Sequence, residues 1–119
     1  MHRNLGPGLL ESVYRECLLI ELRAAGLQVL RERRIPLEYK GVKLTTHLKL
    51  DLLVENSVIV ELKAIDELHP IHQAQVITYL KLAECPVGLL LNFNATSMRK
   101  GMHRLDHPDH YKSTTEKRF

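Results

Sequence analysis

The segment Lys49–Lys63, KLDLLVENSVIVELK, decides the fold because it contains two apolar stretches joined by a polar turn near Asn56. Successive side chains of a strand point to opposite faces, so Glu61 and Lys63 share one face of the second stretch. A hairpin centred near Asn56 places Asp51 roughly opposite Glu61. Charged groups are costly to bury among Leu, Val and Ile unless they pair or bind a metal. We therefore take Asp51, Glu61 and Lys63 as a candidate active site.

The composition predicts one soluble globular domain. Of the 119 residues, 45% are hydrophobic and 26% are charged, which is enough apolar material for one core. The sequence has neither a long apolar run nor the apolar core of a signal peptide, so we expect no membrane span and a cytoplasmic location. The two cysteines, Cys17 and Cys85, lack zinc-site spacing and are expected to be buried thiols. The net charge of +3 permits a polyanionic partner without requiring one.

A helix is predicted before the hairpin. The breaker Gly6-Pro7-Gly8 is followed by helical periodicity over residues 9–25, which ends at Gly26, a residue type common at helix C-termini. Apolar residues cover well over half of the helix circumference, which predicts burial on more than one side. We therefore expect this helix to be a central packing element.

Three consecutive strands are predicted next, and they form a meander. Residues 27–39 alternate loosely between apolar and charged side chains, and Pro36 predicts an edge strand or a bulge there. Val42–Val54 and Val58–Ala64 supply the other two strands. The last of them is apolar on both faces apart from its two charged residues, as is typical of a central strand.

The second half of the chain predicts a crossover. Residues 70–84 form a helix that begins at a proline, and residues 87–93 form a buried strand parallel to its neighbour. A short basic helix is expected within residues 95–105. The predicted order is α-β-β-β-α-β in a domain of residues 1–105, followed by a polar C-terminal tail, residues 106–119, that is expected to be frayed or disordered.

Three further segments accompany the Asp…Glu-x-Lys pattern, which by itself is a weak signal. Gly8–Tyr14 matches G-x-x-E-x-x-Y, and Gln75–Tyr79 matches Q-x-x-x-Y. The third segment, Gly88–Asn94, has the sequence GLLLNFN and contains the last predicted strand with the residues that follow it. Over about residues 4–105 the chain therefore resembles the GxxExxY family of the PD-(D/E)XK nuclease superfamily. The resemblance implies an α/β fold with a restriction-endonuclease-like core, a central mixed sheet flanked by helices. Because family members usually have a helix upstream of G-x-x-E, the chain is expected to begin within that element.

The resemblance also implies roles for the charged residues. Asp51 and Glu61 would bind Mg²⁺, for which Mn²⁺ can substitute, together with the backbone carbonyl of Leu62. Lys63 would orient or deprotonate the attacking water and offset charge on the phosphate. Glu11 would be an additional ligand, directly or through water. The alternative for the charged hairpin residues is a salt-bridge network on an exposed sheet face, and for Glu11 the preference of acids for helix N-termini.

Three polar residues are expected around this centre. Gln75 and Tyr79 are four residues apart and share a helix face. Tyr14 lies one turn after Glu11 and shares its face. By resemblance they would hydrogen-bond near the metal site or the substrate backbone. The alternative for Gln75 and Tyr79 is a partly buried polar pair.

Nucleic acid, DNA or RNA, is the expected substrate, and phosphodiester hydrolysis the expected reaction. The alternative is a catalytically idle nuclease-fold module that binds nucleic acid or a partner protein, with a homodimer as one expected assembly. Six basic residues could follow a phosphate backbone, although a solvated charged surface is the more common explanation: Arg31, Arg33, Arg34, Arg99, Lys100 and Arg104. Three histidines have a spacing that could bind zinc, although a flexible polar tail is favoured: His103, His107 and His110.

Overall fold

Tight turns build the antiparallel part of the sheet in the computed structural model, which describes residues 1–109. The meander consists of β1 (Val29–Tyr39), β2 (Val42–Val54) and β3 (Val58–Lys63). The four residues at its two turns all have positive φ: Lys40, Gly41, Glu55 and Asn56. Positive φ at both central residues is typical of type I′ turns, whose twist matches that of paired strands. The predicted meander is confirmed.

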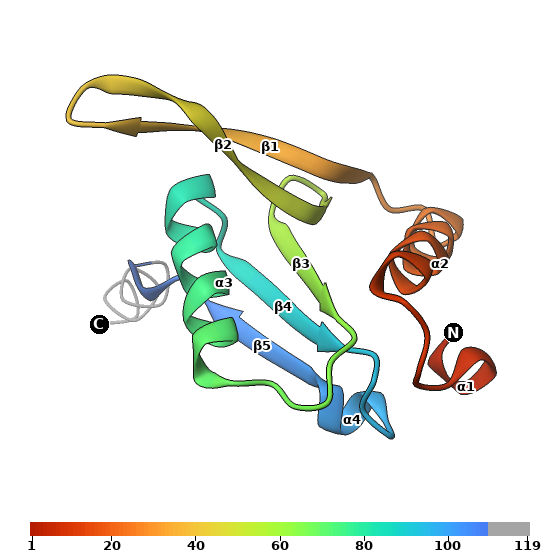
Figure 1. Cartoon of the computed structure of the whole chain (residues 1–119). Coiled ribbons are helices and arrows are strands. Elements are labelled where there is room, and N and C mark those ends of the chain that lie inside the picture. The colour runs from red at the N-terminus through yellow and green to blue at the C-terminus, as the bar shows by residue number, and fades with distance from the viewer. Residues whose placement is uncertain (110–119) are drawn as a thin grey trace, which may run out of the picture.

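A crossover completes the sheet. After β3 the chain forms α3 (Pro70–Ala83) and returns as β4 (Val87–Asn92), which pairs with β3 in parallel. A last strand, β5 (Met102–Asp106), pairs antiparallel with β4. The strand order is therefore β1-β2-β3-β4-β5, a mixed sheet with β3 at its centre (Figure 1). The predicted central position of β3 and the parallel crossover are confirmed.

Helices cover both faces of the sheet, with a separate core on each. One core lies against α3 and includes Leu50, Leu53, Ile59, Val76, Leu80 and Leu90. The other lies against α2 (Glu11–Ala24) and includes Tyr14, Leu19, Val29, Leu52, Val60, Leu62 and Phe93. A short helix, α1 (His2–Leu5), is tied to the end of β4 through a hydrogen bond between His2 Nε2 and the Phe93 carbonyl (3.1 Å). The α/β fold with a flanked mixed sheet is as expected.

Pro36 marks an irregular position on an edge strand, as predicted. β1 pairs only with β2, at the edge of the sheet. Its register to β2 shifts between Pro36 and Glu38, because residues Pro36 and His47 are partners whereas Glu38 is the partner of Lys43. Proline has no N–H to donate, so a bulge at an edge is where it is tolerated.

One prediction about helices is wrong: α2 is not a central element, because only Tyr14 and Leu19 are buried on it and the side chain of Ile20 is 67% exposed. The short basic helix expected within residues 95–105 is confirmed as α4 (Met98–Gly101), but the residues that follow it form β5, a strand that was not predicted. This strand was missed because its side chains are mostly polar and none of them is buried.

The end of the predicted domain also differs in detail. His103 lies within β5 and Asp106 ends that strand, so neither belongs to a tail. The predictions for residues 110–119, including His110, fall outside the described residues. Within residues 1–109 no helix is long and apolar enough to cross a membrane.

Candidate active site

A fork between β2 and β3 brings two carboxylates together. The ladder between the strands runs from Val54 and Val58 to Leu52 and Val60 and then ends, which leaves Asp51 opposite Glu61. At that point the side chains replace the ladder. The backbone N–H of Asp51 donates to Glu61 Oε1 (3.1 Å), and the N–H of Leu62 donates to Asp51 Oδ2 (2.9 Å). The structure thus brings Asp51 and Glu61 together, as the sequence predicts.

The core toward which the β2 side chains point changes at this fork. Leu50 and Leu52 would share one face of a regular strand. Here Leu50 packs in the core against α3, whereas Leu52 packs in the core against α2. Asp51, the residue between them, therefore lies where groups from both sides of the sheet can meet.

Burial dominates the electrostatics of Glu61, whose surface is only 7% exposed. Burial first, and then the negative charge of Asp51, raises the pKa of the Glu61 carboxyl to about 8, against a smaller lowering by Lys63. At neutral pH the carboxylate pair therefore holds a proton. The pair lacks enough positive charge nearby to ionise fully, which is the condition in which a divalent cation binds favourably.

Arg15 is the site residue that sequence reasoning missed. Its Nη2 lies 3.4 Å from Asp51 Oδ1 and 3.3 Å from Glu11 Oε1, and its Nη1 lies 3.8 Å from Glu32 Oε1. Its Nε is buried and has no hydrogen-bond partner among the described residues. The available signal was the spacing of four residues between Glu11 and Arg15, which puts an opposite charge beside the proposed ligand.

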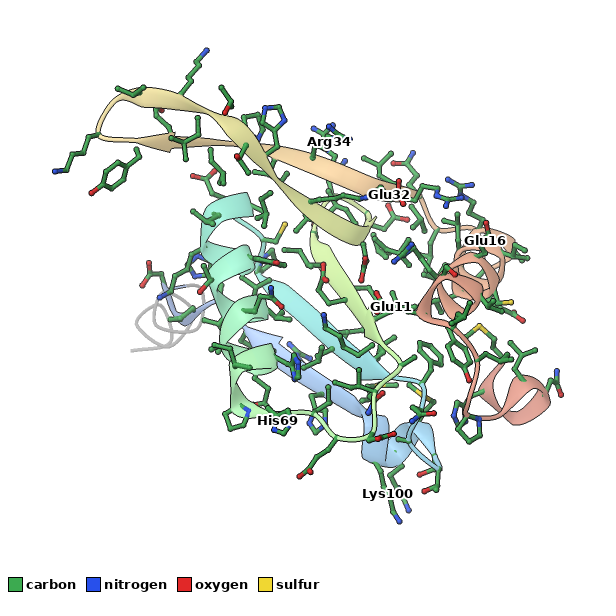
Figure 2. The ribbon with its side chains drawn as sticks, in the orientation of Figure 1. Glu11, Glu16, Glu32, Arg34, His69 and Lys100 are labelled. Atoms are coloured by element: carbon green, nitrogen blue, oxygen red, sulfur yellow. The ribbon has the colours of Figure 1, made fainter. Side chains whose placement is uncertain are left out.

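Glu11 reaches the centre through Arg15. Figure 2 shows Glu11 at the start of α2, on the side that faces β3. One guanidinium bridges Glu11 and Asp51, so the three side chains form a connected group. Residues 1–109 contain no group of three or more His, Cys, Asp or Glu side chains arranged to hold a metal. The additional ligand role of Glu11 therefore stays a prediction.

Side chains of α3 line the other side of the centre. A pocket of about 560 Å³ is lined by Lys63, His72, Gln75 and Tyr79, among others. Burial first, and then the charges of Glu61 and Asp51, raises the pKa of the Tyr79 hydroxyl, while a hydrogen bond with Gln75 lowers it. Tyr79 thus lies within electrostatic reach of the carboxylates. Lys63, Gln75 and Tyr79 are brought together as the resemblance implies.

Tyr14 has a different position. Its side chain is completely buried, and its ring stacks on Phe93 with 4.8 Å between centroids. Its hydroxyl donates to the Gly6 carbonyl and accepts a hydrogen bond from the Leu9 N–H (3.1 Å). A fully buried ring cannot touch a substrate, so in this conformation Tyr14 supports the loop that leads into α2 and Glu11.

Asn92 fixes the chain that follows Lys63. It is the β4 partner of Lys63 and is buried. Its side-chain Nδ2 donates to the Ile65 carbonyl (3.0 Å), and its Oδ1 accepts from the Ile65 N–H (3.2 Å). The sequence signal was a polar residue at the end of an apolar strand, which the prediction of residues 87–93 as a buried strand passed over.

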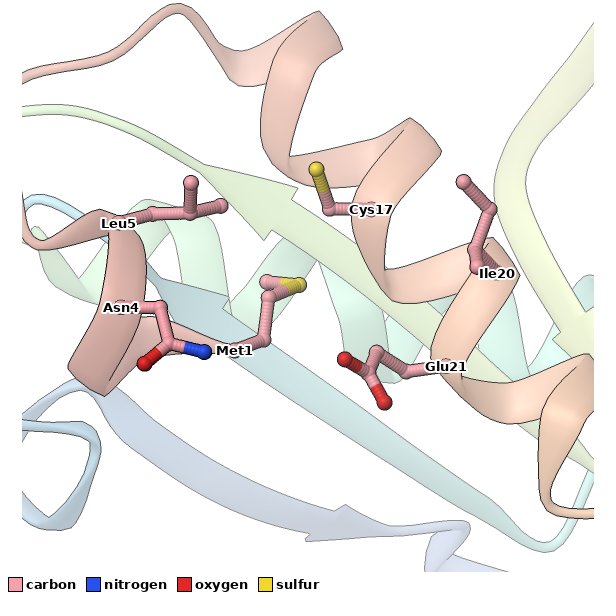
Figure 3. A pocket seen from close by; sticks show the side chains of 6 residues that line it. All are labelled: Met1, Asn4, Leu5, Cys17, Ile20 and Glu21. Carbon is pink, nitrogen blue, oxygen red and sulfur yellow. The ribbon is translucent and has the colours of Figure 1, made fainter.

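A smaller pocket of about 210 Å³ lies between α1 and α2 (Figure 3). It is lined by Met1, Asn4, Leu5, Cys17, Ile20 and Glu21. Most of these side chains are apolar, and the set has one carboxylate. None of them belongs to the carboxylate fork.

The fold and the site define an α/β protein with a mixed sheet, paired carboxylates at a strand fork and a lysine two residues beyond. The sequence profile of the PD-(D/E)XK nuclease superfamily matches residues 1–105, and the chain belongs to that superfamily. Comparison with curated proteins and with solved structures finds no match. Membership indicates a nuclease-like function.

The raised pKa of Glu61 predicts a pH-dependent stability. In the unfolded chain this carboxyl titrates near 4.5, and in the folded chain near 8. Between these values the folded state holds a proton that the unfolded state has released, so rising pH favours unfolding, and above about pH 8 the cost is complete. Glu61→Gln, neutral at every pH, removes this cost. Thermal unfolding in EDTA should show the variant's advantage over the wild type growing between about pH 5 and pH 9.

Glu16→Gln is the matched control because Glu16 is exposed on α2. Its difference from the wild type should stay flat over the same range. A Glu61→Gln curve parallel to the wild type would show that Glu61 is ionised in the folded protein at neutral pH.

Proposed function

We propose that this protein is a divalent-metal-dependent nuclease of the GxxExxY branch that hydrolyses phosphodiester bonds of nucleic acid at the fork between β2 and β3. The observation that carries the proposal is a pair of hydrogen bonds, from the Asp51 N–H to the Glu61 carboxylate and from the Leu62 N–H to the Asp51 carboxylate. They hold two carboxylates side by side in a partly desolvated site next to Lys63. The superfamily match over residues 1–105 supports the same reaction class.

The donor set fits Mg²⁺ or Mn²⁺. Mg²⁺ is usually bound through one or two carboxylates and keeps several waters, so Asp51, Glu61 and the Leu62 carbonyl suffice as protein ligands. The raised pKa of Glu61 supports this, because a carboxyl that burial and a neighbouring negative charge keep protonated gains from a cation. When bound, such an ion supplies positive charge to the scissile phosphate and acidity to a water.

The remaining site residues would orient the attacking water and the substrate and offset the charge of the phosphate. Lys63 lines the pocket and makes no ion pair with any described residue, so its ammonium is available to hold the attacking water or a phosphate oxygen. Gln75 and Tyr79 offer an amide and a hydroxyl to the substrate backbone from the same pocket. Glu11 would add a carboxylate once it leaves Arg15.

Metal-dependent cleavage tests the proposal directly. With Mg²⁺ or Mn²⁺ the wild type should cleave a DNA or RNA substrate, and EDTA should stop the reaction. Asp51→Asn keeps an acceptor for the Leu62 N–H but removes the charge, and Lys63→Ala removes the ammonium. Each should lower the rate by about a hundredfold or more. The assay is gel-resolved cleavage of labelled single-stranded and double-stranded substrates.

The controls remove like charges elsewhere on the surface. Glu16→Gln matches Asp51→Asn, and Lys81→Ala on α3 matches Lys63→Ala. Both should cleave like the wild type. Cleavage that persists unchanged in Asp51→Asn and Lys63→Ala would refute the proposed nuclease site.

Arg15 should compete with the metal for Asp51. Its guanidinium lies 3.4 Å from Asp51 Oδ1, where a positive charge opposes the approach of a cation. Arg15→Gln should therefore bind Mn²⁺ several-fold more tightly in titration calorimetry without substrate. Arg99→Gln, an exposed site on α4, changes the net charge equally and should leave the affinity as it is. Weaker binding in Arg15→Gln would mean that Arg15 orients Asp51 for the metal instead.

A second candidate function is self-association through α2. Leu10, Val13, Cys17 and Ile20 are spaced by three, four and three residues, the spacing of the contact positions in paired helices. Leu10 is 74% exposed and Ile20 67% exposed. This stripe runs beside the pocket of Figure 3, where Cys17 and Ile20 lie along one side of α2. A second copy of the chain would cover it.

Light scattering over a concentration series tests this assembly. The wild type should show twice the mass of one chain, and Ile20→Glu should show the mass of one chain because it places a charge in the stripe. Ile71→Glu is the matched control, since Ile71 is 69% exposed on α3. A wild type that stays monomeric at every concentration would remove this candidate.

A further inference from the structure

The hairpin of β1 and β2 extends well beyond the rest of the sheet. β3 pairs with β2 only at Leu52–Val54, so the part from Arg31 to Lys49, here called the hairpin arm, has no ladder partner outside β1 and β2. Figure 1 shows the hairpin arm reaching past α3. Its base rests on the α3 core through Ile35 and Leu48. The arm is therefore a two-stranded ribbon with an anchored base and a free end.

The net positive charge of the protein lies on the hairpin arm. It contains six of the seventeen Lys and Arg residues and two of the fourteen Asp and Glu residues. Its net charge is thus +4, whereas the rest of the chain has a net charge of −1. All six basic side chains are exposed: Arg31, Arg33, Arg34, Lys40, Lys43 and Lys49. Such a concentration of charge on one ribbon favours a polyanion as its partner.

Little of this charge is neutralised within the described part of the chain. Of the six, only Lys49 makes an ion pair, with Glu32 at 3.8 Å. Arg34 and Lys49 are direct partners across the ladder. Like charges in that position destabilise a strand pair. The hairpin arm therefore maintains repulsion that a row of phosphates would relieve.

The hairpin arm leads directly to the carboxylate fork. Lys49 is two residues before Asp51 on β2, and Glu32, with a left-handed φ of 49°, is opposite Asp51 on β1. Figure 2 shows Arg34 on the hairpin near Glu32, and Lys100 at the opposite end of the molecule. A row of phosphates that lies along the hairpin arm would thus reach the fork.

We propose that the hairpin arm binds the phosphate backbone of a nucleic-acid duplex and directs it to the fork. This inference rests on the proposed function for the identity of its partner. A duplex fits better than a single strand, because unpaired bases need aromatic side chains on which to stack. The hairpin arm has one aromatic residue, Tyr39, and the Lys40 ammonium lies 5.5 Å from the centre of its ring. A two-stranded ribbon also has the width of a duplex groove.

Duplex binding without catalysis tests this inference. Fluorescence anisotropy of a labelled short DNA duplex is measured in EDTA over a series of salt concentrations. The triple variant Arg33→Gln, Arg34→Gln, Lys43→Gln removes charge from the hairpin arm. We expect at least about tenfold weaker binding at low salt and a salt slope smaller by about 2 to 3, one contact for each lost charge. Circular dichroism checks that the variant is folded.

The control triple variant removes the same charge from helices on other parts of the surface: Lys81→Gln, Arg99→Gln and Lys100→Gln. Its affinity should stay within about twofold of the wild type. Equal weakening of both variants would overturn the inference, because net charge alone would then explain binding. Tighter binding of the wild type to the matching single strand would overturn the choice of a duplex.

The binding result is independent of the cleavage result. Wild-type binding that depends on the hairpin arm, without any cleavage, would support this inference and refute the proposed nuclease. Metal-dependent cleavage by the wild type, together with unchanged duplex binding in the arm variant, would support the proposed nuclease and refute this inference.

Discussion

Two hydrogen bonds at the end of the β2–β3 ladder determine the character of this molecule. In an ordinary hairpin the bonds to the Asp51 and Leu62 N–H groups would come from backbone carbonyls. Here they come from the carboxylates of Glu61 and Asp51. Because the side chains occupy the space between the strands, the strands separate beyond this point. This replacement of carbonyl acceptors by carboxylates opens the sheet, brings two acids together and buries one of them.

Two helices supply the charged and polar side chains around the fork. From α2, Arg15 offers a positive charge to Asp51 and holds Glu11 nearby. From α3, the hydroxyl of Tyr79 and the amide of Gln75 face a pocket that also contains Lys63. Burial and the charge of Asp51 leave the Glu61 carboxyl with a pKa of about 8, so the positive groups present do not offset the cost of ionising it. The fork is thus incomplete in charge, although its backbone N–H groups have hydrogen-bond partners.

The sequence predicted the features that follow from local periodicity and failed where distant contacts decide. Alternation and the polar turn located Asp51 opposite Glu61, and the E-x-K spacing put Lys63 on the same face as Glu61. The apolar content of α2 predicted burial on more than one side, but the structure buries only Tyr14 and Leu19 fully, with Leu18 and Leu22 partly buried beside them. β5 contains only two apolar residues, Met102 and Leu105, and none of its side chains is buried, so no periodic signal identified it. Arg15 escaped notice because its partners Asp51 and Glu32 are remote in sequence.

The exchange of ladder bonds for carboxylate bonds also limits how this chain can evolve. At positions 51 and 61 the residue must accept a hydrogen bond from a backbone N–H as well as serve any chemistry. A descendant that no longer needs the reaction cannot simply replace these residues with alanine, because each change would leave a partly buried N–H without a partner. Loss of function by drift would instead retain Asn or Gln at the fork. An amide at either position would keep the hydrogen bond without the charge, so the fork can persist when the charge is lost.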